Sequence, residues 1–501
     1  MITPETLDKY TVTVGIESHV QLKTNTKLFA AVGNDAREAP PNTLVSHICF
    51  GLPGALPVLN EEAVHLATRA AFALGTEPER FSKFDRKHYF YPDLPKGYQI
   101  SQFDEPIIGK GSLTIDVNGV EKVIGITRAH LEEDAGKSTH PAGKDYSLVD
   151  LNRAGTPLLE IVSEPDMHTA AEAKAYAREL YLRMKYADVS DANLYYGNMR
   201  FDVNVSVSTT DQLGTRSETK NLNSFRIVEK AVEYETDRQI EVLEKGERVV
   251  QETRGWDDAK QRTFSQRSKE NADDYRYMPD PDIPPIVLSE EYVAKIKTEM
   301  PVMPPEWRVI LSGIGLDSAS IETLLEAEVE EGQVSYLPLI EMLLNQPEAA
   351  KATSNWIINV EIPLRREKKM TSILSNKDKT SLYLQVYGLV KYNKISSTNA
   401  KSLIIDILDE PNLKINVSDS AETSEVVETY AKNKGYIQNS DEGEIAKIVN
   451  QVLEQNAPAA EDVKNGEMKA IGFLVGQVMK LSQGKANPGL AQDLIKKQLG
   501  I

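Results

Sequence analysis

The chain has 501 residues, of which 41% are hydrophobic and 26% charged, fractions typical of a soluble globular protein. This length exceeds what one hydrophobic core supports, so we expect about two to four domains. The formal net charge of −18 argues against a surface covered with nucleic-acid-binding cations, although a local basic patch is compatible with it. The single cysteine, Cys49, excludes an internal disulfide and a cysteine-based zinc site, and it suits a reducing compartment.

Membrane-spanning and targeting segments are not predicted. No apolar run approaches the roughly 18–20 residues that a membrane span needs. The N-terminal sequence Met-Ile-Thr-Pro-Glu-Thr-Leu-Asp lacks the basic-then-apolar order of a signal peptide and the Arg- and Ser-rich character of a transit peptide. We therefore expect a cytoplasmic protein without a membrane segment.

The first part of the chain, residues 10 to about 290, is rich in predicted strands. Strict alternation of apolar and polar residues predicts strands, and apolar residues at helical spacing predict helices. Strands and helices do not alternate regularly, which favours an α+β fold over a doubly wound parallel sheet. The strand patterns lie at 10–16, 113–117, 123–126 and 201–207, and the helix patterns at 61–74, 169–186 and about 227–243.

A proline-rich segment, residues 277–286, follows this region, with four prolines in ten residues. Proline is incompatible with a helix interior or a central strand, so we expect an extended exit from the first domain. Beyond residue 290 the sequence has helical periodicity throughout, punctuated by polar and glycine-containing stretches. We predict an α+β domain over 1–295, a helical domain over 296–425 and a small helical tail domain over 426–501.

The strand pattern of residues 10–22 carries the first candidate site. Glu17 and His19 are two positions apart and therefore project from the same face of a strand. Side by side, a carboxylate and an imidazole can share a metal ion. The alternative is a strand whose outer face is polar because it contacts solvent.

A second candidate is the acidic run Glu132, Glu133 and Asp134, which follows another extended stretch. Three consecutive acids do not fit into a hydrophobic core without partners. They indicate either a site that binds a cation or a charged loop tip.

The third candidate is a predicted hairpin in which polar and apolar residues alternate on both strands. If the strands pair, cations and carboxylates share one face of the sheet. That face is either a ladder of cross-strand salt bridges or a catalytic surface that supplies carboxylates to a cation and basic groups to phosphate. Its polar residues are Arg200, Asp202, Asn204, Arg216, Glu218 and Lys220.

Longer runs of sequence resemble one family closely. They include Gly51-Leu-Pro-Gly-Ala-Leu-Pro-Val-Leu-Asn60 and His130-Leu-Glu-Glu-Asp-Ala-Gly-Lys137. The family that these runs resemble is the B subunit of aspartyl/glutamyl-tRNA amidotransferase, and the resemblance covers nearly the whole chain. Further matching runs are 89–102, 150–166, 220–225, 251–254, 472–480 and 484–488.

The resemblance implies a glutamine-hydrolysing carbon–nitrogen ligase, working as a heterotrimer in protein biosynthesis. A partner amidase, the A subunit, frees ammonia from glutamine, and a small C subunit holds the assembly together. The B subunit uses ATP and Mg²⁺ to phosphorylate the side-chain carboxylate of glutamate mischarged on tRNA(Gln), or of aspartate on tRNA(Asn). Ammonia that arrives through an internal channel then gives the amide. The resemblance also implies a cradle-shaped catalytic domain similar to glutamine synthetase, and a tail domain that binds tRNA.

The resemblance implies roles for particular residues. It assigns Glu17, His19, Glu133, Asp202 and Glu218 to Mg²⁺. Glu132 is a further catalytic candidate, and the ammonia channel would be lined by Lys87 and again by Glu133. The expected phosphate-binding residues, which rest on the hairpin pattern and not on the resemblance, are Arg200, Arg216 and Lys220.

One departure concerns zinc. Many family members carry Cys-x-x-Cys before the Gly-Leu-Pro-Gly motif, whereas this chain has Ser46-His-Ile-Cys49. His47 and Cys49 do not make a tetrahedral zinc site, and we predict none. Two other functions stay open at this point: a non-catalytic tRNA-binding or scaffold component of the same assembly, and an ATP-dependent ligase that acts on a small amino acid without tRNA.

Overall fold

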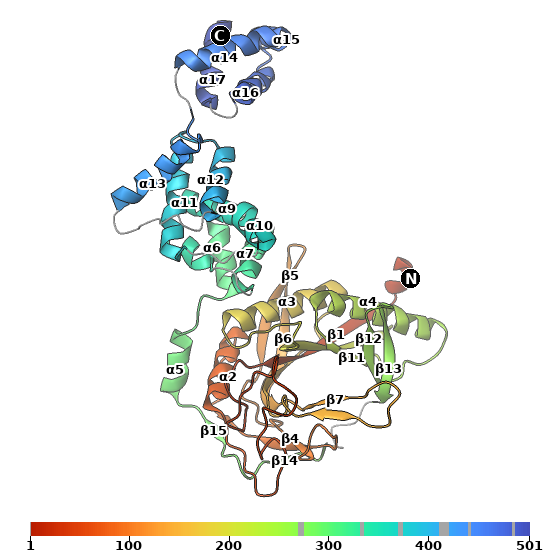
Figure 1. Cartoon of the computed structure of the whole chain (residues 1–501). Coiled ribbons are helices and arrows are strands. Elements are labelled where there is room, and N and C mark those ends of the chain that lie inside the picture. Colours follow the sequence, from red (N-terminus) through yellow and green to blue (C-terminus); the bar gives the residue numbers. More distant parts are fainter. Residues whose placement is uncertain are drawn as a thin grey trace. The chain divides into compact units, whose positions relative to one another are not determined.

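The protein divides into two compact units, Met1–Pro304 and Pro305–Ile501. The computed structural model (Figure 1) describes residues 2–268, 275–330, 335–368, 374–409, 420–438, 442–482 and 486–501. In these ranges no helix is long and apolar enough to cross a membrane. The predicted division into 1–295, 296–425 and 426–501 stays a prediction.

The first unit is built on an eight-stranded mixed sheet. β11 and β12 run parallel, and the other neighbouring strands run antiparallel. In spatial order the strands are β13 (Arg262–Ser268), β12 (Glu252–Asp257), β11 (Ser217–Leu222), β10 (Met199–Ser208), β1 (Thr11–Gln21), β9 (Pro157–Ser163), β6 (Val120–Glu133) and β5 (Gly111–Val117).

Two long helices, α3 (Ala170–Tyr186) and α4 (Phe225–Glu244), cover one face of this sheet. They pack on each other, α3 against β5 and α4 against β10 (Figure 1). The hydroxyls of Thr169 and Ser224 cap them by accepting hydrogen bonds from otherwise unpaired backbone N–H groups. The predicted helices at 169–186 and 227–243 are confirmed, and the third lies at α2 (Glu61–Ala73).

The hydrophobic core of this unit lies between the sheet and these helices. Along β1, Val14, Ile16 and Val20 are fully buried in it, while Glu17 and His19 turn to the opposite face. Val203 on β10 and Leu180 on α3 belong to the same core. The alternation read from the sequence therefore determines which face of the sheet remains available for polar side chains.

Three small sheets complete the first unit. β3 (Asp85–His88) pairs with β4 (Tyr98–Ser101) and β14 (Met278–Pro279). The other two pair β7 (Lys137–Thr139) with β8 (Leu148–Asp150), and β2 (Phe81–Ser82) with β15 (Ile286–Val287). The proline-rich segment, expected as an extended exit, thus forms two short edge strands on the first unit. Arg86 holds it through ion pairs to Asp280 at 2.8 Å and Asp282 at 2.7 Å.

The remaining described elements are helical. α1 (Pro4–Leu7) and α5 (Glu290–Thr298) belong to the first unit. The α+β fold with a helical C-terminal region is confirmed. The second unit contains α6 (Pro304–Gly313), α7 (Ser318–Val329), α8 (Leu337–Glu341), α9 (Pro347–Trp356), a π-helical turn (Ile357–Glu361), α10 (Ile362–Lys368), α11 (Asn376–Lys391), α12 (Ser397–Asp409), α13 (Ser420–Asn433), α14 (Glu442–Gln455), α15 (Ala457–Lys464), α16 (Lys469–Leu481) and α17 (Pro488–Leu499).

The last four helices, α14 to α17, share an apolar cluster of their own. Leu474 and Val478 of α16 are fully buried in it, but Phe473 on the same helix is 51% exposed. The helix is therefore amphipathic and not buried on all sides.

Candidate functional site

Strand register gathers polar side chains on the sheet face opposite α3 and α4. Glu17 on β1 lies across from Asp202 on β10. His19 lies across from Glu160 on β9, which in turn lies across from His130 on β6. Because directly opposed residues project from the same face of an antiparallel pair, these side chains meet. Residues more than a hundred positions apart in sequence thus form one polar surface.

The first group on this face, the carboxylate trio, consists of Glu17, Asp202 and Glu218. One oxygen of each lies within 4.8 Å of the others. The pairing of β10 and β11 contains a β-bulge beside the trio. This bulge turns Lys220 and the backbone N–H of Asn221 toward Asp202. Lys220 Nζ then lies 2.9 Å from Asp202 and 3.4 Å from Glu218, while the Asn221 N–H donates to Asp202 at 2.8 Å.

Charge within the carboxylate trio is unevenly balanced. Burial and the neighbouring carboxylates Glu160 and Glu218 raise the pKa of Glu17 above its usual range. Burial also acts to raise the pKa of Asp202, but the charges of Lys220 and His19 outweigh it and lower that pKa. The cations nearest the trio, Lys220 and His19, are fewer than its three carboxylates, and His19 also pairs with Glu160. An added divalent cation would complete the balance.

The second group, the histidine trio, consists of His19, Glu132 and Glu160, again with ligand atoms within 4.8 Å of one another. His19 Nε2 lies 3.3 Å from Glu160 and 3.8 Å from Glu132. Burial acts to lower the pKa of His19, but its hydrogen bond to Glu160 and the nearby negative charges raise it to about 9. His130 adds a second imidazole, with Nε2 3.6 Å from Glu132.

The donor sets of both trios fit divalent cations. The carboxylate trio offers only oxygen atoms, which Mg²⁺ prefers, whereas the imidazole in the histidine trio also suits softer divalent metals. Glu132, Asp202 and Glu218 are almost completely buried, and buried carboxylates are costly without a counter-charge. The predicted ligands Glu17, Asp202 and Glu218 thus come together, while His19 belongs to the neighbouring group.

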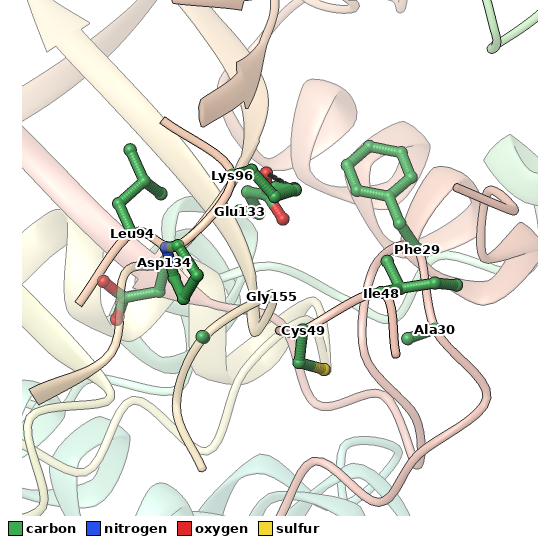
Figure 2. A pocket seen from close by; sticks show the side chains of 11 residues that line it. Phe29, Ala30, Ile48, Cys49, Leu94, Lys96, Glu133, Asp134 and Gly155 are labelled. Carbon is green, nitrogen blue, oxygen red and sulfur yellow. Dashed lines mark hydrogen bonds and ion pairs between the residues drawn. The ribbon is translucent and has the colours of Figure 1, made fainter. Parts of the chain in front are cut away.

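Glu133 does not join either trio. Consecutive strand residues project from opposite faces, so Glu132 faces the histidine trio and Glu133 faces away from it. Glu133 forms an ion pair with Lys96 and accepts a hydrogen bond at 2.9 Å from the backbone N–H of Ile100. Glu133 and Lys96 line a cavity of about 10 Å³, and Asp134 and Cys49 also line it (Figure 2).

Glu160 is a site residue that the sequence interpretation missed. It is the one acid within β9, whose other residues are apolar or small. An isolated carboxylate in an otherwise apolar strand was the signal, because such a group needs a partner when it is buried. Here the partners are His19 and His130, which lower the pKa of Glu160 well below its usual range despite burial.

The predicted cationic residues take different positions. Lys87 lies over the ring of Tyr275 at 4.8 Å, and the charge of Glu132 outweighs burial and raises its pKa. Arg200 forms an ion pair with Asp134 at 3.1 Å. Arg216, expected on a strand, lies just before β11 and is exposed.

A cavity of about 210 Å³ adjoins the carboxylate trio. It lies over β1, β9 and β10, and Leu213 and Gly214 from the segment before β11 also line it. Glu17 and Arg216 both line it, together with Asn204, whose amide donates to Glu17 at 3.1 Å. The cavity is therefore bordered by a carboxylate and a guanidinium, groups that together suit a metal-bound phosphate ester.

Comparison with known proteins identifies the family. Residues 12–294 match the GatB/GatE catalytic domain and residues 339–499 match the GatB domain. The chain is 42% identical to the B subunit of the aspartyl/glutamyl-tRNA(Asn/Gln) amidotransferase of Carboxydothermus hydrogenoformans, over 98% of this chain and 99% of the relative. The B subunit from Bdellovibrio bacteriovorus is also 42% identical with the same coverage, and that of a Thermotoga species is 41% identical. The chain therefore belongs to the family of B subunits of aspartyl/glutamyl-tRNA amidotransferases, ligase-type enzymes, as its sequence motifs predicted.

Proposed function

We propose that this chain carries out the ATP- and Mg²⁺-dependent step of tRNA-dependent amidation. It would phosphorylate the side-chain carboxylate of glutamate on tRNA(Gln), of aspartate on tRNA(Asn), or of both, and then amidate it with ammonia. The observation that carries the proposal is the pair of acidic trios on one sheet face, beside a cavity of about 210 Å³. The names of the relatives support the substrate class.

The chemistry explains why such a face is needed. A carboxylate is a poor electrophile at neutral pH, so it must become an acyl phosphate before ammonia can displace a leaving group. Bringing the triphosphate of ATP to a carboxylate crowds negative charges together. When bound, Mg²⁺ offsets that charge and polarises the phosphoryl group.

The residues of this face would divide the work. Glu17, Asp202 and Glu218 would hold one cation, and His19, Glu132 and Glu160 a second. Lys220, which lies 2.9 Å from Asp202, stands where it can keep that carboxylate ionised and contact a phosphate oxygen. The nucleotide would occupy the cavity beside Glu17, with Arg216 at its rim.

Ammonia would reach the activated carboxylate from the other side of β6. The ion pair of Glu133 with Lys96 lies there, one residue away from Glu132 of the histidine trio. Ammonia needs a polar path that excludes bulk water, and a buried carboxylate–ammonium pair provides one. Lys87, whose charge interacts with Glu132, would stand near the point where ammonia meets the substrate.

The remaining parts of the assembly follow from the family. We propose a cradle-shaped catalytic domain similar to glutamine synthetase, and a tail domain, residues 426–501, that binds tRNA. The chain would act in the cytoplasm, in a heterotrimer with a glutaminase (the amidase, or A subunit) and the small C subunit.

The test is Asp202→Ala or Glu17→Ala in the reconstituted complex, assayed with mischarged tRNA, ATP and glutamine. We expect amidation to be lost while glutaminase activity and tRNA binding survive. Normal amidation by both variants would rule out the assigned site and favour a scaffold role for this chain.

A second pair of variants separates the two faces of β6. Glu132→Gln should abolish ATP hydrolysis that depends on mischarged tRNA, because it alters the cation site. Glu133→Gln should preserve ATP hydrolysis but lower the yield of amide for each ATP consumed. Equal loss of ATP hydrolysis in both variants would contradict the division between the faces.

A further inference from the structure

The single cysteine of the chain is in contact with a buried lysine. Lys27 Nζ lies 3.4 Å from Cys49 Sγ, and the two side chains are 1% and 7% exposed. The lysine also donates hydrogen bonds to the carbonyls of Leu44 at 2.7 Å and Leu151 at 3.3 Å. These contacts from two segments, residues 44–49 and the one at Leu151, fix the ammonium group beside the sulfur.

The surroundings of Lys27 favour the neutral amine over the charged ammonium. Burial lowers the pKa of Lys27 and outweighs the opposing attraction of Cys49 and Glu133. Its hydrogen-bond partners are two neutral carbonyls and the thiol. A buried lysine of this kind is more readily neutral, and the neutral amine is the nucleophile.

A small oxidant has a place to approach the sulfur. Cys49 lines the cavity of about 10 Å³ described above, a volume that holds about one water molecule (Figure 2). Ala30, Ala154 and Gly155 form part of its wall, beside the larger side chains of Phe29 and Leu94. The Lys27 side chain borders Gly155: a Cβ added to this glycine would lie 3.5 Å from Lys27 Cδ.

We propose that Lys27 and Cys49 form a reversible covalent cross-link, in which one oxygen atom joins Lys27 Nζ to Cys49 Sγ, when the protein meets hydrogen peroxide. One peroxide oxidises the thiol to a sulfenic acid and is reduced to water. A second peroxide joins that oxygen to the amine: the nitrogen gives up a hydrogen, the sulfenic oxygen gives up its hydrogen, and two waters leave. The product has one oxygen more and two hydrogens fewer than the original pair.

The distances favour the oxygen bridge over a direct sulfur–nitrogen bond. A direct bond would pull Lys27 Nζ away from the carbonyls of Leu44 and Leu151. A bridging oxygen instead occupies the gap of 3.4 Å between the two atoms, and the side chains can stay close to where they are.

The experiment is peptide mass spectrometry of the full-length protein after treatment with hydrogen peroxide. Modified Lys27 resists trypsin, so the link joins peptide 24–37 to peptide 38–69. We expect their summed mass plus one oxygen and minus two hydrogens, and we expect a dithiol reductant to restore the separate peptides.

Matched samples make the result specific. Lys27→Arg keeps the charge and Cys49→Ser keeps the size, and neither should give the linked species. Wild-type protein oxidised in guanidinium retains both residues without their contact, and it should also give none. The proposal is overturned if the folded wild type shows Cys49 unmodified, or oxidised to sulfinic or sulfonic acid with the two peptides unlinked.

Discussion

Two buried charge clusters of this protein differ in how well their charges are matched. In the second unit, Glu361 is fully buried and accepts hydrogen bonds from Arg365 at 2.8 Å, Lys379 at 2.6 Å and Tyr383. In the first unit, the carboxylate trio has three acids and contacts one lysine, Lys220. The Glu361 carboxylate is completely paired within the protein, by two cations and a tyrosine, whereas the carboxylates of the trio outnumber the cations that contact them and leave negative charge for a bound cation. Burial of charge alone therefore does not distinguish structure from function; the balance of charge does.

The largest expected effect is on the stability of the second unit when the Glu361 cluster is changed. Glu361→Gln removes the buried carboxylate that Lys379 and Arg365 both contact, and should lower the free energy of unfolding of the second unit by about 3–5 kcal/mol. Thermal or urea unfolding followed by circular dichroism measures this. Glu348→Gln is the matched control, because Glu348 also accepts a hydrogen bond from a tyrosine, at 2.8 Å, but is exposed. A similar loss in both variants would contradict a structural role particular to Glu361.

A substitution in the carboxylate trio should impair activity and leave stability unchanged or increased. Glu17→Gln removes one of three crowded carboxylates, so the protein should unfold at the same temperature or a higher one, in line with the raised pKa of Glu17. Amidation should nevertheless fall by about 100-fold, which corresponds to about 3 kcal/mol of transition-state stabilisation. Steady-state kinetics of the assembled complex and thermal unfolding of the same sample test this. Loss of folding together with activity would place Glu17 among the structural residues.

Mg²⁺ should sharpen the difference between the clusters. A cation that binds only the folded state adds about 2.7 kcal/mol at a concentration 100 times its dissociation constant. We expect Mg²⁺ to raise the unfolding temperature of wild-type protein and of Glu361→Gln by similar amounts, and that of Glu17→Gln by less, because the histidine trio is intact in that variant. A shift of the same size in all three proteins would show that the trio is not the binding site.

The smallest expected effect concerns how the stability of the second unit depends on pH in acid. Burial acts to raise the pKa of Glu361, but Lys379 and Arg365 outweigh it and lower that pKa below 4.5. A carboxyl group with a lowered pKa in the folded state stabilises the protein above its unfolded pKa, and this stability is lost as the pH falls through the folded pKa. Acid titration of the second unit should therefore be steeper below about pH 4.5 in wild type than in Glu361→Gln.

Local periodicity predicted much of the fold and part of the site. Alternation in β1 placed Glu17 and His19 on the polar face, and the pairing of β10 with β11 confirmed the expected hairpin. The same alternation placed the members of the carboxylate trio on polar strand faces, but the family resemblance selected them as metal ligands. Local periodicity does not predict which residues of distant strands lie opposite each other. The position of Glu160 across from His19 therefore follows only from the fold.

Two further details depend on geometry that a sequence pattern does not encode. The bulge near Asn221, which has φ +59°, aims both Lys220 and a backbone N–H at Asp202. The family resemblance assigned Glu133 to the metal ligands, and the strand pattern did not separate it from its neighbour Glu132. The structure continues β6 through Glu133, and this turns the two neighbouring carboxylates to opposite faces.

The opposite orientation of Glu132 and Glu133 has a consequence for movement at the end of β6. Glu132 and Glu133 share one peptide unit, so a slide of this strand end by even a fraction of a residue repeat displaces both carboxylates at once. Such a displacement would couple the histidine trio on one face to the Glu133–Lys96 ion pair on the other. Arrival of a ligand on one side would be felt on the other without a moving domain or a distant relay.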